Sequence, residues 1–203
     1  ESKNQTKLEL NTFAVPFHLN EIQDNININT NCISKLSKEK IVDQGLKFHL
    51  EGNIQKAIKY YQFFINQGFN DHRVFSNYGV ILKGLGRLEQ AEWFYRKAVE
   101  LKPDFAQAHS NLGNILKDLG NLKEAELFTR KAIEIKPDFA KAHSNLGNIL
   151  KDFGKLKEAE ISTRKAIEFK SDFPEAHLNL GNILRDLGKL KEAEIYTRKA
   201  IKL

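Results

Sequence analysis

Apolar and small residues recur along this chain with a period of thirty-four positions, from residue 38 to the end. Residues 106–139 and 140–173 differ at only seven of thirty-four positions, and both contain the strings HSNLGNILKD and TRKAIE. A period of about twenty to fifty residues indicates an array of repeated structural units. We count five units, which are residues 38–71, 72–105, 106–139, 140–173 and 174–203.

Small residues divide each unit into two predicted helices. Glycine stands at positions eight and fifteen and alanine at position twenty of every unit; in the third unit these are Gly113, Gly120 and Ala125. Glycine at position fifteen suits the left-handed backbone conformation that ends a helix. Glycine inside a helix costs about 1 kcal/mol relative to alanine, so its recurrence at position eight predicts a partner helix that crosses very closely.

The larger apolar residues complete this pattern. Leu112, Leu116, Leu122 and Ile133 have equivalents in the neighbouring units and predict an apolar face on each helix. Neither helix of a pair can bury this face alone. We therefore expect an all-α fold in which five helical hairpins stack into a right-handed superhelical solenoid with a concave and a convex wall.

The pattern resembles the tetratricopeptide repeat family. The resemblance rests on glycine at position eight, alanine at twenty and twenty-seven, and proline at thirty-two of the second and third units, and it covers residues 38–203. The first unit departs from the pattern with Gln44, Phe64 and Phe69, as an atypical terminal cap would. The resemblance implies a scaffold that binds a protein or peptide in its concave groove.

The string SNLGNILKDLGNLKEAE is also similar to the repeats that precede the catalytic domain of O-linked N-acetylglucosamine transferases. Similar bacterial arrays precede glycosyltransferase or sulfotransferase domains. This resemblance implies that the chain is the recruiting arm of a larger transferase. Within the chain itself no nucleophile, base and orienting group can be assembled, so we predict no enzyme activity and no cofactor.

Asparagine recurs on the predicted outward side of each first helix. Position six lies about 200° around the helix from the core-facing glycine at position eight, and position nine lies on the same stripe as position six. In the family this stripe looks into the concave groove, and in the similar transferase arrays the asparagines at position six contact the substrate backbone. The predicted peptide-binding asparagines are Asn77, Asn111, Asn145 and Asn179 at position six and Asn114, Asn148 and Asn182 at position nine, where the second unit has Val80.

An amide both donates and accepts hydrogen bonds, so a column of amides can pair with the backbone of an extended peptide of any sequence. The alternative is that asparagine only tolerates exposure here or bonds to its own helix. Cations follow on the same wall and complete the predicted peptide-binding set: Lys83, Lys117, Lys151 and Arg185 at position twelve, with Asp118, Asp152 and Asp186 at position thirteen. We expect them to orient a mixed-charge peptide, the alternative being an ordinary solvated surface.

Two more specific sites are not predicted. Chaperone-tail clamps of the family have a basic residue at position five, where this chain has Ser76, Ser110, Ser144 and Leu178. Histidine recurs at position four as His109, His143 and His177. Because copies one repeat apart cannot converge on one ion, we interpret these histidines as packing residues and predict no metal site.

The formal charge of +6 raises nucleic-acid binding as an alternative, since basic surfaces attract phosphate. Lysine alternates with acidic residues, however, as in KDFGKLKEAE, which is typical of mixed, solvated helix faces. The predicted groove also lacks the exposed aromatic rings on which bases stack. We therefore favour a protein or peptide partner. Single-stranded RNA binding and a purely structural spacer are the alternatives.

No stretch approaches the roughly twenty apolar residues of a membrane-spanning helix, and no basic-then-apolar leader is present, so we expect a cytoplasmic location without membrane binding. The single cysteine, Cys32, cannot form an internal disulfide.

The two ends differ from the repeats. Residues 1–37 lack the period, and Phe13, Val15, Phe17 and Leu19 alternate around Pro16 as in a short extended segment, which we expect to dock on the array; a flexible arm is the alternative. In the last unit, no capping helix follows the apolar side with Tyr196, Ala200 and Ile201, so we expect this side to be exposed, to self-associate or to be covered by further sequence.

Overall fold

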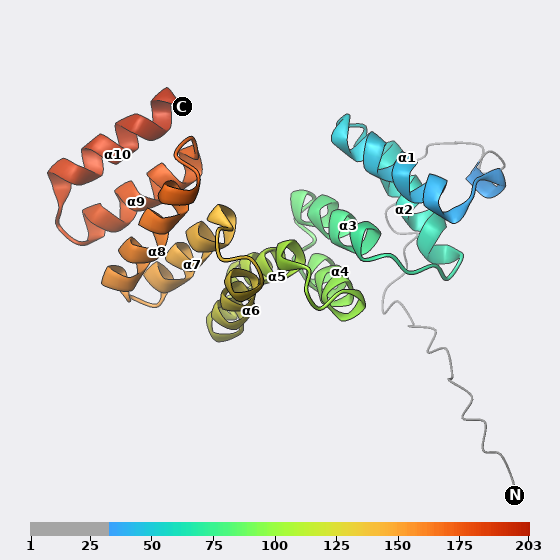
Figure 1. The fold of residues 1–203 in the computed structure, drawn as a ribbon, viewed down its shortest axis with the longest axis horizontal. Helices are drawn as coiled ribbons and strands as arrows, with labels where there is room; N and C mark the ends of the chain where they lie inside the picture. The colour runs from blue at the N-terminus through green and yellow to red at the C-terminus, as the bar shows by residue number, and fades with distance from the viewer. Residues whose placement is uncertain (1–32) are drawn as a thin grey trace, which may run out of the picture. The chain divides into compact units, whose positions relative to one another are not determined.

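A computed structural model describes residues 33–203, and this part of the chain is all-helical (Figure 1). A short 3-10 helix, η2 (Ile33–Lys35), precedes the α-helices. The α-helices are α1 (Lys38–Leu50), α2 (Ile54–Asn66), α3 (His72–Gly84), α4 (Leu88–Leu101), α5 (Ala106–Asp118), α6 (Leu122–Ile135), α7 (Ala140–Asp152), α8 (Leu156–Phe169), α9 (Pro174–Asp186) and α10 (Leu190–Lys202). They fall into one pair per predicted unit, which confirms the helical-hairpin repeat. The extended segment predicted around Pro16 lies outside the described residues.

Glycine at position fifteen turns the chain within each hairpin, as predicted. Gly120 follows α5 with φ +81°, in the left-handed region that other residues avoid. Its amide donates to the Lys117 carbonyl oxygen at 2.9 Å, and this bond closes the last turn of the helix. The second helix of the hairpin begins two residues later, at Leu122.

The two helices of a hairpin cross closely at position eight. A Cβ atom added to Gly113 would lie 2.9 Å from the Ala125 carbonyl oxygen of α6, and one added to Gly79 would lie 2.9 Å from Cε1 of Tyr95. These separations are shorter than carbon contacts allow, which confirms that the glycine makes room for the partner helix. Leu112 and Leu116 are fully buried beside this crossing.

The chain divides into two compact units between Asn70 and Asp71. In the described part of the first unit, α1 packs on α2 and Tyr61 and Phe64 are fully buried. The second unit, Asp71–Leu203, contains α3 to α10. Stacking of the first hairpin on the others stays a prediction.

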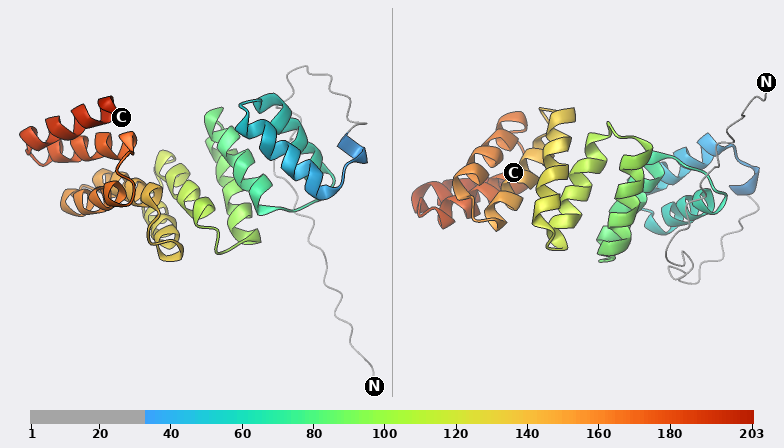
Figure 2. Two further views of the ribbon diagram at one scale, coloured as in Figure 1. Left: turned by 45° about the horizontal axis from the view of Figure 1, so that its top comes forward. Right: turned by 90° about the horizontal axis from the view of Figure 1, so that it is seen from below.

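In the second unit, successive hairpins stack through the second helix of one pair and the first helix of the next, as α4 with α5, α6 with α7 and α8 with α9. Figure 2 shows these pairs following one another in chain order. The first helices α3, α5, α7 and α9 also touch their successors, whereas no two successive second helices touch to the same extent. When a stack of hairpins curves, the helices on the inside of the curve approach one another more closely than those on the outside. The unit is therefore a helical-repeat solenoid whose inner side is formed by α3, α5, α7 and α9, hereafter the inner face.

Most residues of the last helix, α10, are exposed or half-buried. Ala193 is the one residue of α10 that is buried. Ile201 is 81% exposed, as predicted, whereas Tyr196 and Ala200 are half-buried. No helix among the described residues is long and apolar enough to cross a membrane.

Candidate functional site

The position-six asparagines are less open than predicted. Asn111 is only 7% exposed, so the expectation that it faces outward is wrong. Asn145 and Asn179 are half-buried, and their Nδ2 atoms donate to the preceding first helix. Asn145 donates to Oγ and to the carbonyl oxygen of Ser110 at 3.1 and 3.3 Å. Asn179 donates to Oγ of Ser144 at 3.0 Å.

These bonds tie together successive helices of the inner face. The helical wheel of a single hairpin places position six opposite the hairpin core, but the first helices of neighbouring hairpins also contact one another. Position six of one helix therefore meets position five of the helix before it. The side chains of Ser110 and Ser144, which are buried, are structural partners rather than an open part of the site.

The remaining two position-six amides bond within their own helix. Nδ2 of Asn77 donates to the Arg73 carbonyl oxygen at 2.8 Å, and Oδ1 of Asn111 accepts from Nε2 of Gln107 at 3.0 Å. Every asparagine of this column thus has an intramolecular hydrogen bond, so the position-six amides are engaged within the array.

The position-nine asparagines are different. Asn114, Asn148 and Asn182 are partly exposed on α5, α7 and α9, and their side chains form no hydrogen bond with any residue that the structure describes. The equivalent residue of α3, Val80, is 42% exposed. An amide without an intramolecular partner keeps its two donors and its acceptor available. The inner face therefore presents three amides, one each on α5, α7 and α9, that have no hydrogen-bond partner within residues 33–203.

The charged residues at positions twelve and thirteen form pairs toward the N-terminal side of the unit. Nζ of Lys83 lies 2.8 Å from Oδ2 of Asp118, and Nζ of Lys117 lies 2.9 Å from its Oδ1. Burial raises the pKa of the Asp118 carboxyl, but the hydrogen bonds from the two lysines outweigh it and leave the pKa below its usual value. The Lys83 to Asp118 pair links α3 to α5.

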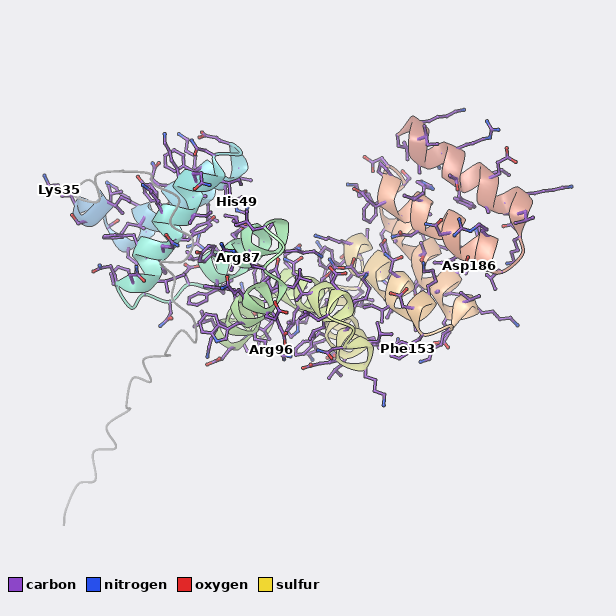
Figure 3. The ribbon with its side chains drawn as sticks, turned by 180° about the vertical axis from the view of Figure 1, so that it is seen from behind. Lys35, His49, Arg87, Arg96, Phe153 and Asp186 are labelled. Carbon is purple, nitrogen blue, oxygen red and sulfur yellow. The ribbon has the colours of Figure 1, made fainter. Side chains whose placement is uncertain are left out.

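Toward the C-terminal side the same positions are more open. Lys151 and Asp152 form no ion pair within residues 33–203. Nε of Arg185 lies 3.6 Å from Oδ1 of Asp186, which is labelled in Figure 3, and the Arg185 side chain is 64% exposed. Within residues 33–203, Lys151 and Asp152 of α7 are therefore the charged side chains at these positions without an ion-pair partner.

One residue of this face was missed by the sequence analysis. Lys141, at position two of α7, is exposed, yet desolvation lowers its pKa. The Lys83 cation lowers this pKa further, and the Glu175 carboxylate opposes the shift. Position two varies between repeats, as Arg73, Gln107, Lys141 and Glu175, so the repeat pattern gave no signal.

The recurring histidines are packing residues, as interpreted from the sequence. Their Nε2 atoms donate to the carbonyl oxygens of Pro103, Pro137 and Ser171, each at 2.8 Å, from His109, His143 and His177 respectively. These bonds hold the start of each first helix against the connection that precedes it. Among the described residues, no group of three His, Cys, Asp or Glu side chains could hold a metal ion.

The repeats match known family models. Models described as tetratricopeptide repeat match residues 106–139, 140–173 and 174–203, and a model described as TPR repeat matches residues 79–120. The chain belongs to the tetratricopeptide repeat family. Proteins of this family typically act as scaffolds for protein–protein interaction, and this general function is supported for the present chain.

Solved structures agree on the fold. MamA from Desulfovibrio magneticus RS-1 is 20% identical, with 82% of this chain and 94% of that chain covered and a TM-score of 0.68. TTC0263, a TPR protein of Thermus thermophilus, is 19% identical, with 82% and 91% covered and a TM-score of 0.69. PilF of Pseudomonas aeruginosa is 18% identical, with 80% and 76% covered and a TM-score of 0.69. No curated protein is similar enough to be matched.

Proposed function

We propose that the inner face binds an extended segment of a partner protein, with Asn114, Asn148 and Asn182 as the principal backbone contacts. The observation that carries this proposal is that these three amides recur at the spacing of one repeat and lack intramolecular partners among the described residues. Each hydrogen bond to a peptide backbone contributes about 0.5–1.5 kcal/mol net, so three contribute roughly 1.5–4.5 kcal/mol before ordering costs. Binding would be weak and tolerant of sequence.

The position-six asparagines have a supporting role in this proposal. Asn145 and Asn179 use their Nδ2 atoms inside the array, which leaves Oδ1 as an acceptor for a backbone N–H group. Asn77 and Asn111 are held within their own helices. Position six thus fixes the spacing of the first helices, and position nine supplies most of the free donors.

Charge selects the side chains of the partner. Desolvation and the Lys83 cation lower the pKa of Lys141, and an acidic group of the partner beside Lys141 would oppose that shift. Lys151 and Arg185 offer further positive charge, and Asp152 and Glu175 offer negative charge. A segment with an acidic residue facing α3 and α7, and mixed charge beyond it, fits this arrangement.

The proposal is tested by selecting peptides from a displayed random library on the wild-type chain and measuring their affinity for variants. Changing Asn114, Asn148 and Asn182 to alanine together should weaken binding about tenfold or more, since two or three bonds near 1 kcal/mol each are lost. A matched control changes the exposed lysines of the second helices, Lys123, Lys157 and Lys191, to alanine. Equal affinity for both triple variants would contradict the proposal.

A melting measurement on the same variants distinguishes loss of binding at the inner face from loss of the fold. Because the position-nine side chains have no hydrogen bonds to the rest of the described chain, their triple alanine variant should melt no lower than the wild type. The narrower version of the proposal, recruitment of a substrate to a transferase domain, rests on the resemblance of the repeats and would need such a domain on the same polypeptide.

Single-stranded RNA is the less favoured partner. Positions five, six, nine, twelve and thirteen of α3, α5, α7 and α9 include no aromatic residue on which a base could stack. Binding of a single-stranded oligonucleotide with an affinity that falls steeply with salt would favour RNA over a peptide. A structural spacer would instead be indicated if no displayed peptide were enriched.

A further inference from the structure

The second helices of the hairpins in the second unit carry an aromatic ring at position twenty-three in every repeat except one. These residues are Phe94, Phe128 and Tyr196, with Ser162 in the fourth repeat. In the third repeat the Phe128 ring lies 5.8 Å from the His109 ring, and in the fifth the Tyr196 ring stacks on His177 at the same distance. The ring thus covers the histidine of its own hairpin.

The Phe128 ring and the Tyr196 ring each lie under the guanidinium of an arginine from the preceding repeat. Cζ of Arg96, labelled on α4 in Figure 3, lies 5.6 Å from the centre of the Phe128 ring, and its guanidinium binds both oxygens of Glu124 at 2.8 and 2.9 Å. Cζ of Arg164 lies 5.4 Å from the centre of the Tyr196 ring. Its Nη1 donates to the Tyr196 hydroxyl at 2.9 Å.

The fourth repeat has the same arrangement of arginine, histidine and glutamate but lacks the aromatic ring. Arg130, His143 and Glu158 occupy the equivalent positions, but Ser162 has no ring to place between them. The Arg130 guanidinium bonds to Glu126 of its own helix through Nε and Nη2, and its Nη1 has no hydrogen bond within the described residues. Glu158 forms no ion pair there either. The His143 ring contacts Phe169 instead, at 5.3 Å.

A cavity of about 460 Å³ lies at this place, between α6, α7 and α8. Its apolar wall includes Ile133, Leu146 and Leu150, and Arg130, Glu158 and Ser162 are also among its lining residues. A cavity of this size is within the range of about 300–1,000 Å³ that holds small organic groups. The lining carries both signs of charge, with Glu134 and Lys165 also present, so it does not select an ion of one sign.

We infer that this cavity receives the tyrosine side chain of a partner protein. The argument is that the protein itself fills the next equivalent place with Tyr196, using the same arginine, histidine and glutamate positions. A ring in the cavity would lie under the Arg130 guanidinium, and cation–π attraction favours an aromatic over an aliphatic group. Nη1 of Arg130, which has no partner among the described residues, corresponds to the atom of Arg164 that binds the Tyr196 hydroxyl, and this favours tyrosine over phenylalanine.

The site is independent of the inner face. It is built largely by α6 and α8, the second helices of two hairpins, and it contains none of the position-nine asparagines. The loss of peptide binding at the inner face would therefore leave it intact, and the reverse also holds.

The experiment uses N-acetyl-tyrosinamide as the probe and follows the methyl signals of the labelled chain by NMR. The wild type should show saturable shifts of the Ile133, Leu146 and Leu150 methyl groups, with a Kd on the order of 1–10 mM. N-acetyl-leucinamide should bind at least about fivefold more weakly because it cannot stack under a guanidinium.

Two substitutions at one position and a third in the neighbouring repeat test the geometry. Ser162→Tyr should fill the cavity and abolish the shifts, whereas Ser162→Ala should keep them. Phe128→Ser should create a second responsive site beside His109 and Arg96. Absence of saturable shifts in the wild type, unchanged shifts in Ser162→Tyr, or equal binding of the leucine probe would overturn the inference. Binding of p-cresol without N-acetyl-tyrosinamide would overturn the assignment to a protein side chain.

Discussion

Replacing Asn145 with alanine removes hydrogen bonds that link two helices, whereas replacing Asn148 on the same helix removes no hydrogen bond within residues 33–203. Nδ2 of Asn145 donates to Oγ and to the carbonyl oxygen of Ser110 on α5, and the side chain of Asn148 has no hydrogen bond among the described residues. Both changes replace asparagine with alanine inside α7, so both gain a similar helix propensity, about 0.5 kcal/mol. The difference between the two variants therefore isolates the bonds to Ser110.

We expect Asn145→Ala to be less stable than Asn148→Ala by about 1–3 kcal/mol, since two bonds worth about 0.5–1.5 kcal/mol each are lost. The fully buried Ser110 hydroxyl also loses its partner, which places the result toward the upper end. For a unit of this size, 1 kcal/mol lowers the melting temperature by roughly 2–5 °C. Urea denaturation followed by circular dichroism gives the two free energies of unfolding. Equal values would refute the claim that position six holds the first helices together.

Three further predictions concern the core, pH and assembly. Leu112→Ala should lower the free energy of unfolding by about 2–5 kcal/mol, measured by urea denaturation, because this side chain is fully buried; an unchanged value would contradict the assigned register. The lowered pKa of Asp118 stabilises the fold above the unfolded pKa near 4, and this contribution is lost as pH falls through the lower folded pKa. The stability gap between wild type and Asp118→Asn should therefore shrink as the pH falls below about 4, and a gap that stays constant would assign it to something other than charge. Because Ile195 and Ile201 are 63% and 81% exposed, sedimentation should show concentration-dependent association that Ile201→Lys abolishes; a monomer at all concentrations would oppose it.

The hairpins could be predicted from the sequence because each depends on contacts inside one period. Gly113 and Gly120 mark a close crossing and a left-handed turn, and both requirements are local to the hairpin. The burial of Asn111 could not be predicted in this way. It depends on how closely successive first helices approach one another, and that distance is set between hairpins. The helical wheel of one hairpin contains no information about it.

The helical wheel has the same limit for the candidate site, whose role in binding stays a prediction. The sequence pointed to one stripe of the first helices but did not distinguish position six, where Asn145 and Asn179 are bonded, from position nine, where the amides have no hydrogen bond within the described chain. Lys141 was missed because it lies at a position that changes from repeat to repeat. By contrast, a signal for the cavity beside Ser162 was present in the sequence. One of the seven differences between the third and fourth units is Ser162 in place of Phe128. The sequence alone did not show that this change leaves a cavity, because that inference needs the contacts that the equivalent rings make in the structure.

The array can tolerate serine in place of phenylalanine at position 162 because the stability of a solenoid is approximately a sum over its units and the interfaces between neighbouring units. Truncating a buried aromatic side chain costs about 3–5 kcal/mol in a core that cannot collapse. In a repeat array this cost falls on the contacts of one unit with its neighbours, and the other interfaces keep their own contributions. The α4–α6 and α8–α10 pairs retain their arginine clamps over Phe128 and Tyr196, so they can hold the helices on both sides while the place at Ser162 stays open. One missing ring can therefore become a binding site without loss of the fold.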